Sequence, residues 1–375
     1  MKIALIGNSD ICIYNYRYEL IERLLKDGHS VSVISPNGAF ISELINMGCA
    51  YYETELDRHG TNPVKDLKLI RVYKKLLKEI APDYVFTYTI KPNIYGAMAC
   101  RKLGIPCIAN ITGLGTAVEN GGLLQFITVT LYKFAFRKVQ TVFFQNQENM
   151  SFFVEKKLYV EKHKLLPGSG VNLTRFIPYE YPPDETVDFV FISRLMKEKG
   201  IDQYLEAAKY IKQKYPHTRF HICGACEKEY EPQMQTLSES DTVIYHGMVK
   251  NIETVLKDVH CTIHPTYYPE GLSNVLLESC ACARPIITTD RAGCREVVED
   301  GVNGFVVKQQ DSQDLIDKIE KFLNLSWQER KQMGLNGRAK VEREFDRQIV
   351  VRKYLEEIGA QESVPVNEGS FAGNI

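Results

Sequence analysis

Two glutamates, Glu270 and Glu278, lie eight positions apart at a predicted strand-to-helix junction. The apolar residues 260–266 are typical of a buried strand, and residues 273–283 predict a short helix that ends before Pro285. Glu270 therefore falls in the turn, and Glu278 lies about one turn inside the helix, only about 6 Å beyond Asn274 at about 1.5 Å per residue. Such a carboxylate pair could act as an acid and a base, or could accept hydrogen bonds from the hydroxyl groups of one ligand.

The turn between these glutamates predicts an anion site. Backbone N–H groups at the start of a helix have no acceptor within the helix, and the helix dipole favours negative charge there. Such groups are supplied by Gly271, Leu272, Ser273 and Asn274. A ligand with hydroxyl groups at both ends and phosphate between them, such as a nucleotide-sugar, fits this layout.

A pair of cations follows the predicted strand 188–194. Arg194 ends this strand, and Lys199 lies five positions later, directly before Gly200. Fixed cations at this point would stabilise the negative charge that develops on a departing diphosphate. Arginine can bind phosphate through two N–H groups, whereas lysine acts as a point charge. The alternative is a basic, solvated helix start, although cations oppose the helix dipole at that end.

Together these segments resemble the E-x7-E and R-x4-K-G motifs of the retaining glycosyltransferases of family 4, which have the two-domain GT-B fold. The resemblance implies that Glu278 holds the ribose hydroxyls, that Glu270 lies beside the donor sugar, and that Arg194 and Lys199 bind the donor diphosphate. It also implies a nucleotide-sugar co-substrate, expected to be a UDP-sugar, without a metal or other cofactor. The glutamates would then position the donor, and the leaving phosphate would help to remove the acceptor proton.

Two further segments of the second half match the family. Residues 293–296 resemble the G-x-x-E step near the donor site and place Glu296 there, where we expect it to begin a helix. An acid is favourable at any helix start, so a structural role is the alternative. Residues 246–251 resemble the loop that contacts the nucleobase, here through main-chain groups near Met248 and Val249.

In the first half, residues 6–17 form a predicted strand and the loop that follows it. They do not match the G-x-G-x-x-G fingerprint, so dinucleotide binding is disfavoured. By position they resemble the first loop of the family, which reaches the donor diphosphate and the acceptor. Gly7, Asn15 and Arg17 are therefore candidates, with a structural role weighed equally.

A second loop of the first half departs from the family pattern. Many members carry a histidine followed by glycine beside the donor sugar, but here Thr112 precedes Gly113, so the identity of a general base stays open. The segment TGLG and the T-x-K-P-x-x-x-G stretch at 89–96 resemble transferases that extend sugars on a lipid diphosphate. This resemblance implies a polyprenyl-diphosphate-linked saccharide as acceptor. Lys91 either meets an acceptor phosphate or has a structural role.

The order of the predicted elements favours an α/β protein with two doubly wound, Rossmann-like domains that face a cleft. A length of 375 residues also favours two domains. The predicted parts are an N-terminal acceptor-side domain (1–166), a linker (167–186), a donor-binding domain (187–346), a helix that closes back on the first domain (347–360) and a disordered tail (361–375).

Charge is unevenly distributed along the chain. Residues 1–166 contain 21 Lys and Arg against 15 Asp and Glu, while the remainder contains 25 against 32. A basic first half indicates an anionic partner, either a membrane surface or a phosphorylated acceptor, although a chance imbalance is equally acceptable. Residues 65–80 and 123–139 predict helices that combine apolar residues with cations. These helices could lie on an anionic membrane or pack against the sheet.

The remaining features describe the setting. Neither a leader nor a run of 18 apolar residues is found, so we expect a cytoplasmic protein, either free or peripheral on the inner face of the cell membrane. The ten cysteines have no metal-ligand spacing and predict reduced thiols. A nucleic-acid partner is not expected, and the oligomeric state stays open.

The predicted function is transfer of a hexose or N-acetylhexosamine to a lipid-linked saccharide in cell-surface polysaccharide or glycan synthesis. Two alternatives belong to other classes. One is a GT-B enzyme that is not a transferase, such as a UDP-sugar epimerase, and the other is a catalytically idle nucleotide-sugar-binding subunit. The donor sugar, the linkage and the pathway cannot be assigned from sequence, because donor selectivity depends on a few atoms of the pocket.

Overall fold

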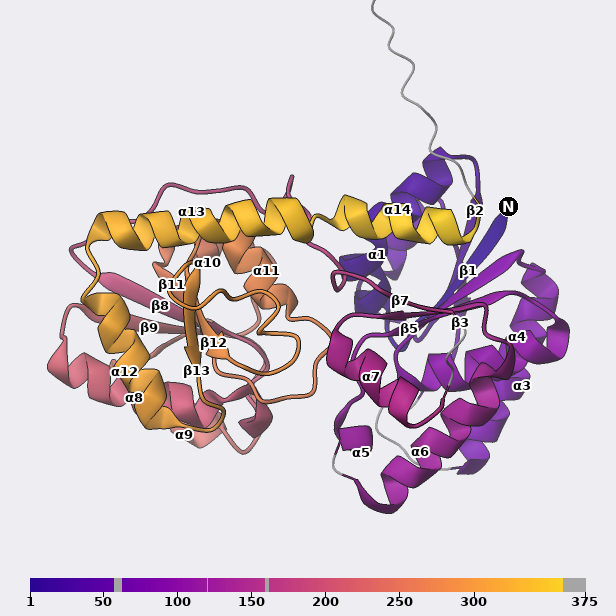
Figure 1. Cartoon of the computed structure of the whole chain (residues 1–375), viewed down its shortest axis with the longest axis horizontal. Helices are drawn as coiled ribbons and strands as arrows, with labels where there is room; N and C mark the ends of the chain where they lie inside the picture. The colour runs from indigo at the N-terminus through magenta and orange to yellow at the C-terminus, as the bar shows by residue number, and fades with distance from the viewer. Residues whose placement is uncertain (57–62, 120, 159–161, 360–375) are drawn as a thin grey trace, which may run out of the picture.

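The computed structural model describes residues 1–56, 63–119, 121–158 and 162–359. The expected tail at 361–375 lies outside this part of the chain. Two parallel sheets, each covered by helices on both faces, form two units that lie side by side (Figure 1). The predicted α/β fold class is therefore confirmed.

The N-terminal unit contains seven parallel strands in the order β3-β2-β1-β4-β5-β6-β7. The order reverses beside β1, since Ile3 of this strand is paired with Val31 on one side and with Tyr84 on the other. Ligands of such sheets bind beyond the carboxyl ends of the strands at this reversal. The strands are β1 Lys2–Ile6, β2 Ser30–Ser35, β3 Ala50–Glu53, β4 Tyr84–Tyr88, β5 Cys107–Ile111, β6 Thr141–Phe144 and β7 His163–Leu165.

Side chains cap the free N–H groups at the start of α1 and α7, whereas α2, α4 and α6 begin without such a cap. Ser9 caps the first helix by accepting from the N–H of Cys12 (3.2 Å), which satisfies a donor that the helix leaves free. The helices are α1 Asp10–Lys26, α2 Ile41–Asn46, α3 Pro63–Ile80, α4 Ala97–Leu103, α5 Thr116–Glu119, α6 Gly122–Ala135 and α7 Gln147–Glu155, with a π-helix at Pro92–Gly96 and a 3₁₀ helix at Phe136–Lys138.

The C-terminal unit contains six parallel strands in the order β10-β9-β8-β11-β12-β13. Its order reverses beside β8, which lies between β9 and β11. The strands are β8 Val187–Ile192, β9 Thr218–Cys223, β10 Ile244–Tyr245, β11 Cys261–His264, β12 Ile286–Thr289 and β13 Gly304–Val307. The helices are α8 Ile201–Lys214, α9 Glu231–Glu239, α10 Ile252–Asp258, α11 Asn274–Ala281, α12 Ser312–Leu323 and α13 Trp327–Glu344, with a 3₁₀ turn at Lys197–Lys199.

The last helix, α14 (Arg347–Glu357), continues from α13 across to the N-terminal unit (Figure 1). Its Tyr354 packs edge-on against Phe86, and the Tyr354 hydroxyl donates to the side chain of Asn110. At the start of the helix, the guanidinium of Arg347 forms a buried ion pair with Glu19 of α1 (2.9 Å). The last described helix therefore packs into the core of the N-terminal unit, in which the chain began.

The two amphipathic helices of the N-terminal unit pack differently. Leu69, Tyr73 and Leu77 of α3 are buried in the core, so the cations of this helix lie on its outer face. The buried residues of α6 are only Thr128, Tyr132 and Ala135. Its large apolar residues Leu123, Leu124, Phe126, Ile127 and Phe134 are exposed, and we call them the α6 patch. Of the described helices, none is long and apolar enough to span a bilayer.

Candidate functional site

Three loops of the C-terminal unit meet at the carboxyl ends of its strands. The first follows β8 and carries Lys199, the second follows β11 and carries Glu270, and the third is the turn after β12 that contains Gly293. The Lys199 ammonium forms an ion pair with the Glu270 carboxylate. The N–H of Ser273 donates to the carbonyl oxygen of Gly293 (2.8 Å). The chain thus brings together three segments that the sequence assigned to the donor site.

The pair formed by Lys199 and Glu270 is largely shielded from solvent, since each side chain is 15% exposed. Burial alone would raise the pKa of Glu270, but the Lys199 ammonium and the His264 ring outweigh it and hold this pKa well below its usual value. The His264 ring lies behind the pair, with Nε2 3.8 Å from Oε1 of Glu270. The Lys199 ammonium also lies 4.7 Å above the ring of Tyr268. The Lys199 ammonium is therefore held beside an ionised carboxylate at a place that is largely shielded from solvent.

Glu278 lies in a different environment. Burial raises its pKa to about 7, against the opposing attraction of Arg347 and Arg175. Within the described residues, no side chain or backbone group forms a hydrogen bond with this carboxylate. Tyr16 of α1, in the N-terminal unit, lies within electrostatic range of both glutamates. Burial is the main cause of the raised pKa of its hydroxyl group, and the charges of Glu278 and Glu270 also raise this pKa. Sequence analysis overlooked Tyr16, although it lies in the first loop-to-helix segment.

The start of α11 offers unpaired donors. In the part of the chain that the structure describes, the N–H groups of Gly271, Leu272 and Asn274 have no hydrogen-bond acceptor, whereas the N–H of Ser273 is occupied by Gly293. The side-chain oxygens of Ser273 and Asn274 are also buried without a partner. Buried polar groups are normally hydrogen-bonded, so an unpaired cluster indicates a place for a ligand or water. Three of the four predicted N–H groups are available here.

The N-terminal unit touches this loop directly. A Cβ atom on Gly271 would lie 2.6 Å from the carbonyl oxygen of Thr112, and one on Gly113 would lie 3.0 Å from the carbonyl oxygen of Pro269. The side-chain amide of Asn146, at the end of β6, donates to the carbonyl oxygens of Glu270 (3.2 Å) and Gly271 (2.5 Å). The structure therefore places Thr112 and Gly113 against the donor loop, and it adds Asn146, which sequence analysis did not single out.

Two further contacts between the units are ion pairs. Arg291 is paired with Glu119 of α5, and Arg295 is paired with Glu148 of α7 (2.6 Å). Each pair joins the turn after β12 to a helix of the N-terminal unit. Ion pairs that solvent reaches contribute little stability, typically below about 1 kcal/mol, so these two add only weakly to the contact between the units.

The other N-terminal candidates make their described contacts within the N-terminal unit or with Arg347. Gly7 ends β1, where a Cβ atom would come within 2.9 Å of Ile13. Asn15 meets Arg347 only through its backbone carbonyl oxygen (3.0 Å). Arg17 is 2% exposed, and its guanidinium lies 4.4 Å above the ring of Tyr88, so its charge points into the unit.

Lys91 directly precedes the π-helix Pro92–Gly96 after β4. Its side chain is half-buried. Interruptions of this kind in helices are frequent at functional sites. The contact of Lys91 with an acceptor phosphate stays a prediction.

The remaining C-terminal candidates differ in their surroundings. Arg194 is exposed and lies 3.7 Å from Glu227, so it is far less constrained than Lys199. Met248 is exposed, whereas the neighbouring Val249 packs against the core. The expectation that Glu296 begins a helix was wrong. Residues 292–297 form turns, and the Glu296 carboxylate accepts from the N–H of Gly293 (2.7 Å), because a side chain three residues ahead can satisfy this free donor.

Comparison with known proteins follows this geometry. Residues 176–340 match the family described as glycosyl transferases group 1, and residues 2–146 match the family described as glycosyl transferase 4-like. Together the two matches span most of the chain. The chain is a glycosyltransferase with the GT-B fold.

Solved structures and relatives agree with this assignment. The glycosyltransferase resembles a Rickettsia africae glycosyltransferase (TM-score 0.78, 18% identity, 97% and 99% of the two chains) and Anabaena HepE in complex with UDP and glucose (TM-score 0.77, 19% identity, 96% and 100%). It is 26% identical, over 95% of its length and 97% of the relative, to the Campylobacter jejuni N,N'-diacetylbacillosaminyl-diphospho-undecaprenol alpha-1,3-N-acetylgalactosaminyltransferase. Staphylococcus aureus CapM, a capsular polysaccharide biosynthesis glycosyltransferase, is 25% identical over 88% and 90% of the two chains.

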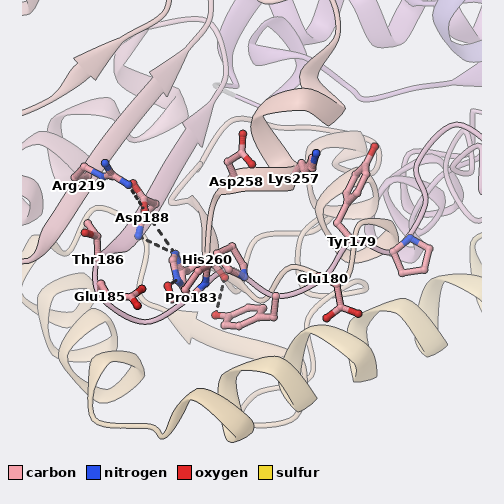
Figure 2. Close-up of a pocket in the computed structure, with 13 residues that line it drawn as sticks. Tyr179, Glu180, Pro183, Glu185, Thr186, Asp188, Arg219, Lys257, Asp258 and His260 are labelled. Carbon is pink, nitrogen blue, oxygen red and sulfur yellow. Dashed lines mark hydrogen bonds and ion pairs between the residues drawn. The ribbon is translucent and has the colours of Figure 1, made fainter.

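A separate pocket of about 600 Å³ lies at the opposite edge of the C-terminal sheet of the glycosyltransferase (Figure 2). Its residues come from the segment 178–186, from the end of α10 and from the amino ends of β8, β9 and β11. Asp188 accepts two hydrogen bonds from Arg219 (2.6 and 2.9 Å), and His260 contacts the carbonyl oxygen of Pro183 (2.9 Å). These contacts hold the connecting segment against the sheet.

In the described ranges, no three His, Cys, Asp or Glu side chains are placed to hold a metal ion.

Proposed function

We propose that this glycosyltransferase transfers a sugar from a UDP-sugar to a saccharide linked to a polyprenyl diphosphate, with retention of the anomeric configuration. The observation that carries the proposal is the shielded Lys199–Glu270 pair beside unpaired N–H groups at the start of α11. Anabaena HepE, with the same fold, was solved with UDP and glucose, which supports the choice of donor. The Campylobacter jejuni relative, named for a diphospho-undecaprenol acceptor, supports the choice of acceptor.

In this proposal the C-terminal unit (187–346) binds the donor. The diphosphate lies against the N–H groups of Gly271, Leu272 and Asn274, and Lys199 shares its charge between Glu270 and the phosphate. The carboxylate of Glu278 has no hydrogen bond of its own among the described residues and accepts from the ribose hydroxyls. Arg194 follows the diphosphate from a more exposed position.

The reaction in this proposal is a front-side displacement. The acceptor hydroxyl oxygen forms a bond to the anomeric carbon while the bond from that carbon to the diphosphate oxygen breaks. The electron pair of the broken bond goes to the diphosphate oxygen, which also takes the acceptor proton. Negative charge grows on the diphosphate during this step, so a cation that is already in place stabilises the transition state more than the ground state. Lys199 supplies that cation, while Glu270 faces the donor sugar.

The acceptor is assigned to the N-terminal unit (1–166), where the Thr112–Gly113 loop reaches the donor loop. We propose that the α6 patch enters the interface of an anionic membrane and brings this unit to its lipid-linked substrate. The exposed fractions of Leu123 and Phe126 are 75% and 69%, and Lys133, Arg137 and Lys138 follow at the end of the helix. Apolar side chains flanked by cations are the composition that binds such surfaces.

The test is a screen of UDP-sugars against a short polyprenyl-diphosphate-linked saccharide, with the product identified by mass and its anomer by NMR. We expect one donor to be consumed and one glycosidic bond with the anomeric configuration of the donor to form. An inverted product would overturn retention. Release of an epimerised sugar without acceptor would favour the epimerase alternative. UDP binding without any transfer would favour the idle nucleotide-sugar-binding subunit, and the absence of both would contradict the donor assignment.

A further inference from the structure

Asn146 uses both ends of its side-chain amide. The residue follows β6 in the N-terminal unit and is 2% exposed. Its Oδ1 accepts from the N–H of Asn149 (2.8 Å) and so caps α7. Its Nδ2 donates to the carbonyl oxygens of Glu270 (3.2 Å) and Gly271 (2.5 Å) in the C-terminal unit. One amide therefore connects the start of a helix in one unit to the loop that carries Glu270 in the other.

This contact determines the direction of the loop backbone. In a trans peptide, the carbonyl oxygen and the following N–H point in opposite directions from a planar group. When Asn146 holds the carbonyl oxygens of Glu270 and Gly271, it turns the N–H groups of Gly271 and Leu272 away from itself. These are two of the three N–H groups at the start of α11 that lack an acceptor among the described residues.

The loop has little freedom to relax from this arrangement. A Cβ atom on Gly271 would lie 2.2 Å from Oε1 of Gln145 and 2.6 Å from the carbonyl oxygen of Thr112. On the other side, the N–H of Ser273 is held by the carbonyl oxygen of Gly293. The loop is therefore held between the N-terminal unit and the turn after β12. Asn146 supplies the hydrogen bonds from the N-terminal unit.

We propose that Asn146 is a positioning residue that aligns the N–H groups of Gly271 and Leu272 with the donor diphosphate when the two units are closed. This inference rests on the proposed donor site. It makes diphosphate binding depend on a side chain of the unit that does not bind the donor. Opening of the cleft removes the two hydrogen bonds and frees the loop, so binding of the diphosphate and closure favour each other.

The competing explanation is that Asn146 only caps α7. The substitution Asn146→Asp separates the two roles, because Asp is as good a helix cap as Asn but places an oxygen instead of an N–H against the carbonyl oxygens of Glu270 and Gly271. A matched control is Gln147→Glu, the same chemical change at the next position. Gln147 is exposed, and its amide contacts only Ser151 of its own helix (3.4 Å).

We expect Asn146→Asp to weaken UDP binding about tenfold, because positioning hydrogen bonds of this kind typically contribute that much. Binding of uridine, which lacks the diphosphate, should stay within about twofold. The melting temperature should fall through loss of the two hydrogen bonds to the loop, while α7 keeps its cap. Gln147→Glu should leave UDP binding within about twofold. UDP binding is measured by calorimetry, and uridine binding by ligand-observed NMR.

Equal loss of UDP and uridine binding, or no loss at all, would overturn the positioning role while leaving the proposed function intact. If the wild-type protein neither binds UDP nor transfers a sugar, the proposed function itself is wrong. Asn146→Ser serves as a second variant should Asn146→Asp fail to fold, because serine caps a helix and lacks the amide donor. The same selective loss of UDP binding is expected for it, and retention of full UDP affinity would contradict the positioning role.

Discussion

The two faces of the cleft are built differently. On the C-terminal face, Lys199, Glu270 and Gly293 come from three loops that are joined by an ion pair and by backbone hydrogen bonds. On the N-terminal face, the candidates do not form one cluster: Arg17 points into the core, and Asn15 contributes a backbone oxygen to Arg347. One face is thus preorganised for a charged ligand, while the other offers loops and an exposed apolar helix.

This difference shows where each substrate can obtain its binding energy. A nucleotide diphosphate carries concentrated charge, so a few fixed donors and one cation recognise it. A lipid-linked saccharide is delivered at a surface, and the surface contact can supply part of its affinity through the α6 patch. The predictions below test whether the donor face depends on single residues and the acceptor face on a patch.

The largest effect is expected on the donor face. Lys199→Ala should lower kcat/KM for transfer by about 10²–10³, the loss typical when one preorganised donor to a developing negative charge is removed. Lys197→Ala is the matched control, because Lys197 lies exposed in the same 3₁₀ turn. The kcat/KM of Lys197→Ala should stay within about twofold of the wild-type value. Initial rates of transfer, with the donor identified by the screen, give kcat/KM for both variants. Equal losses in the two variants would contradict a special role of Lys199.

A smaller effect is expected on the α6 patch. The double substitution Leu123→Ser with Phe126→Ser should weaken partitioning onto vesicles of phosphatidylglycerol and phosphatidylcholine by about 2 kcal/mol, or about thirtyfold, since two large apolar side chains no longer enter the interface. Ile45→Ser is the control, because Ile45 is an exposed apolar residue of α2. Vesicle flotation measures the partitioning. Unchanged binding of the double variant, or a wild-type dimer that the double substitution converts to a monomer, would assign the patch to another role.

Glu278 should make donor binding dependent on pH. Because burial raises its pKa to about 7, the free protein holds the carboxyl protonated below that pH, and the carboxylate that accepts from ribose is formed only above it. UDP affinity should therefore fall by up to about tenfold between pH 8 and pH 6, and Glu278→Gln should remove this component while leaving the titration of UDP itself. Calorimetry at pH 6 and pH 8 measures the UDP affinity of both proteins. The same dependence on pH in Glu278→Gln and in the wild-type protein would contradict the ribose role.

The same raised pKa has a consequence for stability. A carboxyl group with a higher pKa in the folded state than in the unfolded state contributes stability below its unfolded value, and this contribution is lost as pH rises toward about 7. Glu278→Gln should therefore flatten the dependence of the unfolding free energy on pH between about 4.5 and 7. Denaturant titrations across that window measure this effect.

The smallest effect concerns α3. Arg71→Ser combined with Lys75→Ser should change vesicle partitioning by no more than about threefold, because the apolar face of α3 is buried in the core and only charge attraction remains. Raising the salt concentration should abolish the difference. A loss as large as that of the α6 double variant would place α3 on the membrane together with α6.

The α/β fold and the meeting of Lys199 with Glu270 could be predicted because both depend on local patterns. Strand ends follow from apolar runs, and motif residues at the carboxyl ends of parallel strands must share one edge of the sheet. The burial of Arg17 was missed, although it lies on the buried stripe of α1 with Ile13 and Leu20. That spacing was the available signal.

Other features were outside the reach of local patterns. Asn146 meets Glu270 across 124 positions of sequence, and nothing in either segment indicates the contact. The choice between α3 and α6 depended on which apolar face the neighbouring elements cover, which is a property of tertiary packing. At Glu296 the expected helix was replaced by turns because Gly293, with φ of +90°, redirects the chain.

The two connections between the units are joined where they cross. The N–H of Val171 donates to the carbonyl oxygen of Phe345 (2.8 Å), and the N–H of Arg347 donates back to the carbonyl oxygen of Val171 (3.1 Å). Beside them, Asn172 and Arg347 both bind the carboxylate of Glu19. Two segments held together at one point cannot slide past each other there, so we expect relative motion of the two units to be a rotation that pivots at this point.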